Sequence, residues 1–251
     1  MLSKINIEDV KNIALQAGEA IMEIYKKDFS IEYKEDKSPL TEADTLANEI
    51  ICSALQKLYP HIPLLSEENK EVAYEVRKNW EYYWCIDPID GTKEFIKRNG
   101  EFTVNIALIY KDRPVLGVVY APDLHEMYAA KKNEGAFKNG KKLPLQTNKT
   151  PKEKLFVVAS KSHLSQETQT FINSLDTKEA VQILRGSSLK LCMVAEGTAD
   201  IYPRLAPTME WDTAAAHAIV LESGKKVLKF ASEDEIVYNK KELLNPWFVV
   251  V

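Results

Sequence analysis

The sequence predicts an α+β protein built in layers, with helices packed on sheets. The first half opens with two long helical patterns and continues with short apolar runs typical of an antiparallel meander. The second half alternates strands with helices, and a polar segment at residues 145–154, LQTNKTPKEK, separates the two patterns. We therefore expect an N-terminal half over residues 1–150 and a C-terminal half over residues 151–251, without internal repeats.

The helices of the first half follow from the spacing of their apolar residues. From Ile7 to Tyr25 apolar side chains recur every three or four positions, as one face of an amphipathic helix requires. A second stripe begins after Thr41, which is placed as an N-cap, and ends before Pro60. The later runs FTVNIALIY, VLGVVYAP and EMYAA, with turns between them, predict the meander.

The second half is predicted element by element from the same two periodicities. Its expected segments are a strand in KLFVVAS, a helix near residues 166–175, a strand in AVQILRG, a helix in SLKLCMVAEG, a short strand in DIYPR, a helix over 211–222, and terminal strands that include WFVVV. Such a mixture places helices on both sides of small sheets.

Length, composition and charge limit the function. A chain of 251 residues with 45% hydrophobic and 28% charged residues can bury a core without disulfides or structural metal. The net charge of −4 argues against binding to a nucleic acid polymer, and no apolar run approaches the length of a membrane span. Three separated cysteines, Cys52, Cys85 and Cys192, predict buried free thiols in a reducing compartment, so we expect a cytoplasmic protein.

Four acidic residues stand where apolar elements meet turns: Glu67 in LLSEEN, Asp87 and Asp90 in IDPIDG, and Asp212 in MEWDTAA. Asp87 and Asp90 side by side would raise each other's pKa unless a cation lay between them. A solvated turn rich in Asp, Pro and Gly explains the segment alone equally well. A set of carboxylates without His or Cys at ligand spacing favours binding of Mg²⁺ and, after it, Mn²⁺. The histidines are scattered along the chain, and we expect them on the surface or in packing roles: His61, His125, His163 and His217.

The Gly91-Thr92 pair that follows the two aspartates has a phosphate-binding interpretation. A helix that starts there would point free amides at an anion, Gly91 would allow close approach, and the Thr92 hydroxyl could orient a water. A metal cluster beside such amides is a phosphoryl-transfer site. Asp44 stands three residues after Thr41, and this spacing alone favours a capping-box role for it.

Four segments in the same order resemble the magnesium-dependent, lithium-sensitive phosphatases of the inositol monophosphatase superfamily: KSPLTEAD (37–44), LLSEE (64–68), WCIDPIDGT (84–92) and EWDTAA (210–215). The resemblance covers nearly the whole chain. Further segments resemble the bacterial CysQ-type 3'(2'),5'-bisphosphate nucleotidases of sulfur metabolism: GTKEFI (91–96), ASKSH (159–163), GSSLK (186–190), IYPR (201–204) and LLNPWF (243–248). The resemblance implies a layered αβαβα sandwich of the inositol monophosphatase/fructose-1,6-bisphosphatase type, with the active site between the halves.

The resemblance also implies a set of metal ligands. Glu67, Asp87 and the backbone carbonyl of Ile89 would hold one ion, and Asp87, Asp90 and Asp212 would hold a second. A third, weaker ion would lie near Glu67. Two to three Mg²⁺ ions per site are implied, with Mn²⁺ as a substitute.

By the same resemblance, Asp44 and Thr92 would form the pair that polarises the attacking water, which replaces the capping interpretation of Asp44. The substrate contacts implied are Gly91, Thr92, Lys161, Gly186, Ser187, Ser188, Lys190 and Arg204. Two simpler alternatives stay open, in which GSSLK is only a helix N-terminus with serine caps and Arg204 only a partner in a surface ion pair.

The implied activity is hydrolysis of 3'-phosphoadenosine 5'-phosphate to AMP and phosphate by a metal-activated water, without a phospho-enzyme. Leu205, Ala206 and Ala216 depart from the Phe and glycines expected in the bacterial nucleotidases, at the edge of the adenine site. The alternatives are a broad-specificity inositol or sugar phosphate phosphatase with the same metals, and a catalytically silent nucleotide-binding regulator. The sequence is compatible with a monomer or a homodimer.

Overall fold

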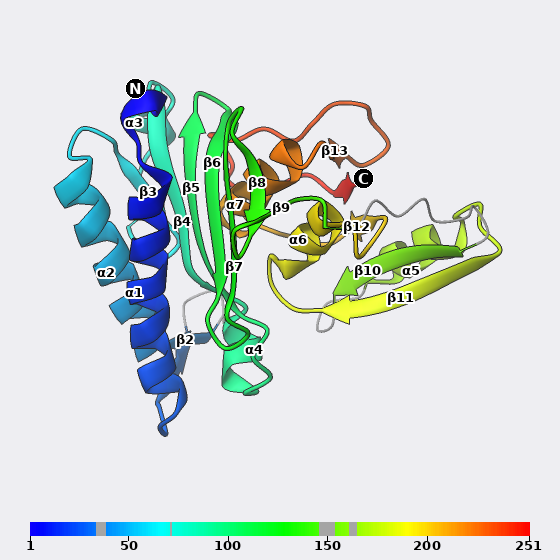
Figure 1. Ribbon diagram of the computed structural model, residues 1–251, viewed down its shortest axis with the longest axis horizontal. Helices are drawn as coiled ribbons and strands as arrows, with labels where there is room; N and C mark the ends of the chain where they lie inside the picture. The colour runs from blue at the N-terminus through cyan, green and yellow to red at the C-terminus, as the bar shows by residue number, and fades with distance from the viewer. Residues whose placement is uncertain (34–38, 71, 146–153, 161–164) are drawn as a thin grey trace.

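The structure, a computed structural model, describes residues 1–33, 39–70, 72–145, 154–160 and 165–251. Its elements stack as alternating helical and sheet layers, from the N-terminal helices at the left of Figure 1 to the lobe at its right. The order of the layers is α, β, α, β and α, so the predicted αβαβα sandwich is confirmed. Among the described residues, no helix is both long and apolar enough to cross a bilayer.

The outermost layer consists of α1 (Ile7–Tyr25) and α2 (Glu42–Leu58), which have the predicted bounds. The Asn6 side chain accepts the Glu8 N–H at the start of α1, and Thr41 caps α2 by accepting the Ala43 N–H. The apolar faces of both helices pack on one face of the large sheet and form a common core with it. A 3-10 helix (Leu2–Lys4) precedes α1, and the small hairpin strands β1 (Ile31–Tyr33) and β2 (Pro39–Thr41) lie between α1 and α2.

The second layer is a seven-stranded sheet with the strand order β3-β4-β5-β6-β7-β8-β9. Its first pair is parallel and all its other pairs are antiparallel, which confirms the predicted meander. The strands are β3 (Leu64–Ser66), β4 (Tyr82–Asp90), β5 (Thr103–Tyr110), β6 (Arg113–Ala121), β7 (Glu126–Lys131), β8 (Gly135–Lys138) and β9 (Lys141–Lys142).

A bulge in β4 explains how two aspartates three residues apart reach the same place. Asp87 pairs with Asn105 and Asp90 with Thr103, so three steps along β4 match only two steps along β5. In a regular strand, residues three apart point to opposite faces. The extra residue of the bulge shifts this alternation, and both carboxylates can point to one side of the sheet.

The remaining layers come from the second half of the chain. The helices α6 (Leu189–Glu196) and α7 (Glu210–Glu222) form the third layer, and α7 packs directly on the large sheet. The fourth layer has a parallel pair and a three-stranded antiparallel sheet, and α5 covers it. These elements are β10 (Lys154–Ser160), α5 (Gln166–Asn173), β11 (Glu179–Arg185), β12 (Tyr202–Arg204), β13 (Val227–Lys229) and β14 (Phe248–Val250).

The boundary expected near residue 150 falls within 146–153, outside the described residues. Because α7 packs on the sheet of the first half, one hydrophobic cluster contains residues from both halves. The two halves are therefore joined by a common core, and their division at residue 150 stays a prediction.

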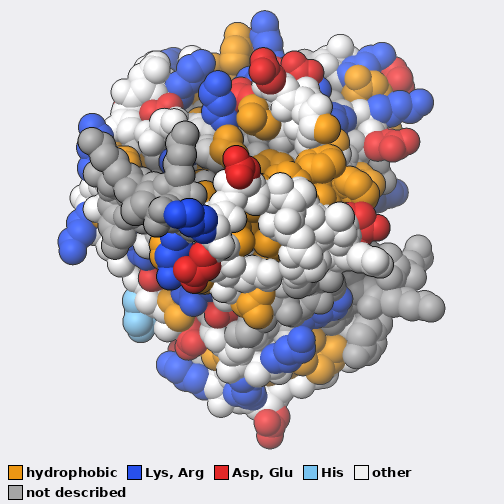
Figure 2. All heavy atoms as spheres, turned by 90° about the vertical axis from the view of Figure 1, so that its right-hand side faces the viewer, with side chains coloured by type: hydrophobic (Ala, Val, Ile, Leu, Met, Phe, Trp, Pro, Cys, Tyr) orange, Lys and Arg blue, Asp and Glu red, His pale blue; other side chains and the backbone are white. Residues whose placement is uncertain are grey.

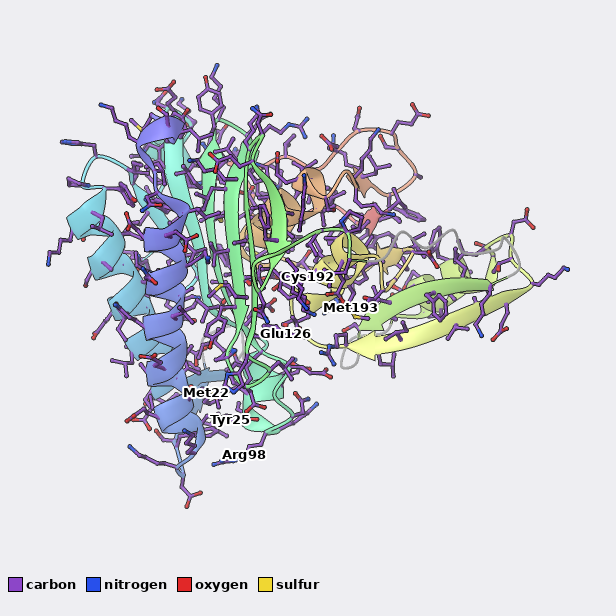
Figure 3. The ribbon with its side chains drawn as sticks, viewed as in Figure 1. Met22, Tyr25, Arg98, Glu126, Cys192 and Met193 are labelled. Carbon is purple, nitrogen blue, oxygen red and sulfur yellow. The ribbon has the colours of Figure 1, made fainter. Side chains whose placement is uncertain are left out.

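Two short helices complete the fold around the sheet ends: α3 (Tyr74–Arg77) and α4 (Thr92–Ile96). The segment after α4 is fixed to the end of α1, because the Arg98 guanidinium donates to the carbonyls of Tyr25 and Lys27. The guanidinium also lies over the rings of Tyr25 and Phe29, and Figure 3 labels Arg98 and Tyr25 near the lower end of α1. These contacts hold the helix that begins at Thr92.

The cysteines and histidines follow the predictions with one exception. Cys85 and Cys192 are buried and free, but Cys52 is only half-buried, so the prediction of a buried thiol is wrong there. The Cys52 thiol sits on α2 beside the polar side chain of Asn48. His217 is fully buried against Tyr238, which is the expected packing role, whereas His61 and His125 are exposed and His163 lies outside the described residues.

A close approach of β6 to α7 gives a test of this packing. A Cβ at Gly117 would lie 2.1 Å from the Ala215 carbonyl oxygen and 2.9 Å from the Ala218 Cβ. We expect Gly117→Ala to lower the free energy of unfolding by about 1–3 kcal/mol, as overpacking does. Urea unfolding measures it, with Gly140→Asn as the control, because Gly140 has a left-handed backbone that Asn tolerates and open space around it. Equal losses for the two variants would contradict the close packing.

Candidate active site

The predicted site residues meet in one pocket of about 370 Å³ between the large sheet and the second half of the chain. Every described residue predicted to contact metal or substrate lines it, whereas Asp44 lies behind the lining and Lys161 is outside the described residues. The predicted residues in the lining are Glu67, Asp87, Ile89, Asp90, Gly91, Thr92, Gly186, Ser187, Ser188, Lys190, Arg204 and Asp212.

Three carboxylates in this pocket form a group that could hold a metal ion. Glu67, Asp87 and Asp212 each offer an oxygen, and these oxygens lie within 4.8 Å of one another. Asp87 Oδ1 accepts the Ile89 N–H at 3.0 Å, but Asp87 Oδ2 is buried without a hydrogen-bond partner. Because an unpartnered buried carboxylate oxygen is costly, its presence among three carboxylates fits a hard divalent cation.

Asp90 reaches the same pocket but is not part of this group of three. Its carboxylate accepts the Ser188 backbone N–H and lies 3.5 Å from the Asn105 Nδ2. Burial raises the pKa of Asp90 to about 6, although the nearby Lys190 ammonium acts in the opposite direction. The structure therefore brings Asp90 beside the group and surrounds it with donors from both halves of the chain.

Burial and mutual repulsion govern the protonation of the acidic group. Burial raises the pKa of Asp87 well above its usual range, and Glu67 and Asp90 raise it further. The pKa of Asp212 rises to about 8, again chiefly through burial and then through Asp90 and Glu67. Without a cation, such carboxyls keep protons that a divalent ion would displace.

Asp44 makes the capping contacts and also contacts Thr92, the residue with which the resemblance pairs it. Its Oδ2 accepts the Thr41 backbone N–H at 2.8 Å and the Thr41 hydroxyl at 2.7 Å, which is a capping box at the start of α2. Its Oδ1 accepts the Thr92 hydroxyl at 3.3 Å. The two oxygens of one carboxylate thus anchor α2 and orient Thr92, so the interpretations are compatible.

The helix predicted after Gly91 is present. α4 starts at Thr92, and Gly91 has a φ of +94°, a left-handed conformation that favours glycine. A Cβ at this position would lie 3.3 Å from the Glu101 carbonyl oxygen. The chain therefore turns tightly between the last aspartate of β4 and the threonine that faces Asp44.

Ser188 occupies the N-cap position of α6 but makes no side-chain capping bond. Its hydroxyl donates to Asn105 Oδ1 and lies 2.9 Å from Thr103 Oγ1, both on β5. The alternative that the serines of GSSLK only cap a helix is therefore wrong for this residue. The Ser187 hydroxyl lines the pocket, and its oxygen is buried without a partner.

Two cations face the pocket beside this turn. The Lys190 ammonium donates to the Ser187 carbonyl at 2.5 Å, and burial lowers the pKa of Lys190 to about 8. Arg204 donates through Nη2 to the Pro207 carbonyl at 2.8 Å, while its Nε is buried and unpartnered. No ion pair of Arg204 occurs within the described part of the chain, so the surface ion-pair alternative is wrong there.

The sequence analysis missed two polar residues of the site. Asn105 holds Asp90 and Ser188, and its signal was a polar residue inside the apolar run TVNIALIY. Thr208 lines the pocket with a buried, unpartnered hydroxyl oxygen, and it stands just before the EWDTAA segment. By contrast, the three departures from the expected adenine edge are absent from the pocket lining: Leu205, Ala206 and Ala216.

The space-filling view shows the face of the molecule that carries the second half of the chain (Figure 2). On this face, lysine and arginine side chains are interspersed with acidic and apolar ones.

Comparisons with known proteins match these features over almost the whole chain. The model of the inositol monophosphatase family matches residues 1–247. The 3'(2'),5'-bisphosphate nucleotidase CysQ of Salmonella typhimurium is 46% identical over 246 residues, which cover 97% of this chain and 98% of that protein. CysQ of Escherichia coli K12 is 43% identical with the same coverage.

Solved structures agree in fold. CysQ of Bacteroides thetaiotaomicron superposes with a TM-score of 0.88 at 44% identity, covering 98% of this chain and 96% of that one. The IMPase of Thermotoga maritima gives a TM-score of 0.78 at 25% identity, with 95% and 89% of the two chains covered. From its sequence, its fold and the family model, the chain belongs to the inositol monophosphatase family.

Proposed function

We propose that this protein is a magnesium-dependent 3'(2'),5'-bisphosphate nucleotidase that hydrolyses 3'-phosphoadenosine 5'-phosphate to AMP and phosphate. The observation that carries the proposal is the group of Glu67, Asp87 and Asp212, beside the threonine that faces Asp44. Relatives named as bisphosphate nucleotidases, 37–46% identical over most of the chain, support the substrate class. Free thiols at all three cysteines support the predicted cytoplasmic location.

The donor set supports magnesium as the metal. Glu67, Asp87, Asp90, Asp212 and the Ile89 carbonyl are all oxygen donors in or beside one pocket. When bound, divalent ions would supply Lewis-acid stabilisation of the charge that develops on the phosphate and leaving oxygens. The protein's own contribution is to hold these carboxylates together against their repulsion.

Thr92 and Asp44 provide the proton path. The Thr92 hydroxyl lies 3.3 Å from both Asp44 Oδ1 and the Ile89 carbonyl oxygen. When the Ile89 carbonyl binds a cation, the hydroxyl proton is given to Asp44, and the Thr92 oxygen can accept a hydrogen bond from a water in the pocket. That contact orients the water toward the phosphate. A proton that leaves the water can then pass through the Thr92 hydroxyl to the Asp44 carboxylate. The capping bonds from Thr41 fix the Asp44 carboxylate in place.

The second phosphate and the ribose would be held on the opposite wall. Lys190 and Arg204 present positive charge to the pocket, and Arg204 has a free buried N–H there. The Ser187 and Thr208 hydroxyls, buried without partners, are available to a ribose or a phosphate. A sugar or inositol monophosphate has no second phosphate and would leave the Lys190 and Arg204 charges unpaired.

The substrate class is tested by phosphate release in magnesium. We expect 3'-phosphoadenosine 5'-phosphate to be hydrolysed at least about a hundredfold more efficiently than inositol 1-phosphate or fructose 1,6-bisphosphate, which is about 2.7 kcal/mol of discrimination. Asp87→Asn is the blank and should lose more than about a thousandfold in rate, because the metals supply several kcal/mol. Comparable rates on all three substrates would instead indicate a broad-specificity phosphatase.

The role of Lys190 is tested by a change that keeps its stem. Lys190→Met removes the charge that faces the second phosphate, so activity on the bisphosphate should fall about 10- to 100-fold more than activity on adenosine 3'-monophosphate. The ratio of the two kcat/KM values is measured, which cancels any common effect of Lys190 on Asp90. An unchanged ratio would remove Lys190 from the proposed substrate contacts.

The raised pKa values predict how magnesium and pH act on stability. When a chelator removes divalent ions, Asp90 and Asp212 have pKa values of about 6 and about 8 in the folded state. Aspartates of the unfolded chain are already ionised at these pH values. The folded state then binds more protons, so stability falls as pH rises through this window. Thermal unfolding at pH 6 and pH 8.5 should therefore show a larger stabilisation by Mg²⁺ at the higher pH. An equal gain at both pH values would contradict the raised pKa values.

A further inference from the structure

A buried asparagine near the end of the chain contacts Met209, the residue whose N–H holds Asp212. Asn245 is 4% exposed, and its Nδ2 donates to the Met209 carbonyl at 2.8 Å and to Thr213 Oγ1 at 3.0 Å. The Met209 N–H in turn donates to Asp212 Oδ2 at 2.8 Å. The backbone of Met209 is therefore held by Asn245 at its carbonyl and holds Asp212 through its N–H.

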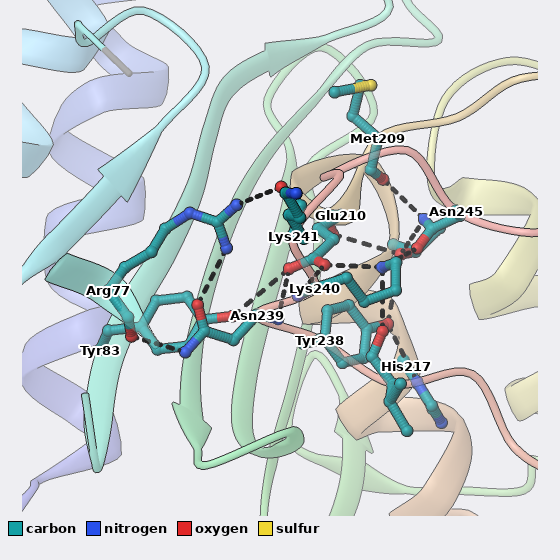
Figure 4. A network of polar contacts seen from close by, with 12 residues as sticks. Arg77, Tyr83, Met209, Glu210, His217, Tyr238, Asn239, Lys240, Lys241 and Asn245 are labelled. Carbon is teal, nitrogen blue, oxygen red and sulfur yellow. Dashed lines mark hydrogen bonds and ion pairs between the residues drawn. The ribbon is translucent and has the colours of Figure 1, made fainter. Parts of the chain in front are cut away.

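Asn245 is itself fixed by a buried ion pair. Lys240 donates to Asn245 Oδ1 at 3.3 Å and to Glu210 Oε1 at 2.6 Å, and the Glu210 side chain is fully buried. Glu210 also accepts the backbone N–H groups of Asn239 and Lys240. Figure 4 shows these residues as one network, with Asn245 between Met209 and Lys240.

We propose that Asn245, held by Lys240 and Glu210, is a positioning residue that fixes the backbone of Met209 and through it the Asp212 carboxylate. We call Glu210, Lys240 and Asn245 the C-terminal latch. The inference rests on the metal site of the proposed function, and it assigns a task to the segment LLNP, which the chemistry itself does not use.

The position of Asp212 explains why such support is needed. The charges of Asp90 and Glu67 repel the Asp212 carboxylate, and Asp212 lies in the first turn of α7. A side chain there would rotate or move away from like charges unless its backbone contact were rigid. The latch supplies that rigidity, because it ties the start of α7 to residues 237–245 by side-chain and backbone bonds.

The latch also shapes the pocket wall. The Glu210 N–H donates to the Leu243 carbonyl and the Asn245 N–H to the Thr208 carbonyl, while Met209 and Leu244 form a β-bridge. Thr208, Met209 and Leu244 all line the pocket. A displaced latch would therefore move a metal ligand and a substrate wall together.

Two variants and a matched control test the proposal. Asn245→Leu keeps the volume and the net charge but removes both donors, and Glu210→Gln weakens the ion pair without changing its shape. The control is Glu196→Gln, because Glu196 is also buried and paired with a lysine, Lys138, at 2.8 Å. That pair joins the end of α6 to β7 and β8, and Figure 3 labels its neighbour Glu126.

The readout is Mn²⁺ binding by titration calorimetry without substrate, compared with the thermal unfolding temperature in chelator. We expect Asn245→Leu and Glu210→Gln to weaken Mn²⁺ binding at least about tenfold, as loss of supporting contacts to a ligand does, while Glu196→Gln binds like the wild type. A merely structural role would lower the unfolding temperature of all three variants and leave Mn²⁺ affinity unchanged.

The outcomes separate this inference from the proposed function. Wild-type affinity for Mn²⁺ in Asn245→Leu, or no Mn²⁺ binding by the wild type, would overturn the positioning role. Stoichiometric Mn²⁺ binding by the wild type that is weakened in Asn245→Leu would support the positioning role. If the wild type binds Mn²⁺ in this way but fails to hydrolyse the bisphosphate nucleotide, only the proposed function is overturned.

Discussion

Repulsion among closely spaced carboxylates, of which Asp87 is buried and Glu67 and Asp212 are partly exposed, is the constraint on which the rest of this structure depends. Glu67, Asp87 and Asp212 place oxygens within 4.8 Å of one another, with Asp90 beside them. Like charges out of water destabilise a fold unless a cation or protons neutralise them. The surrounding elements can therefore be understood as a frame that keeps these groups together for a metal. The β4 bulge directs Asp87 and Asp90 toward the pocket, and the Met209 N–H at the start of α7 holds Asp212.

The frame is built from both halves of the chain. The Ser188 side chain, from the second half, forms hydrogen bonds with Thr103 and Asn105 on β5 of the first half. In addition, α7 packs closely on β6 at Gly117. A site at such a seam can combine rigid metal ligands from one side with substrate contacts from the other. Residues outside the predicted set, such as Asn105 and Asn245, contact the residues that line this site.

Several side chains serve the fold and the site at once. Asp44 uses one oxygen to cap α2 and the other to accept the Thr92 hydroxyl, so the start of a helix is tied to the proposed site. Asp212 likewise accepts the N-cap N–H of Met209 while it contributes to the acidic group. Where one carboxylate has both tasks, a choice between structural and functional interpretations is unnecessary, because its two oxygens point to different partners.

The sequence by itself determined the element order, the helix bounds of α1 and α2, the meander and the residue types of the site, because these depend on local periodicity and short motifs. It also supplied the family resemblance that the comparisons confirm. Only the tertiary structure decided that Ser188 bonds to β5, that Cys52 is half-buried, and that Asp90 stands beside the group of three. It alone revealed Thr208 and the C-terminal latch. These depend on contacts between residues that are distant along the chain, and such contacts leave no local pattern in a single sequence.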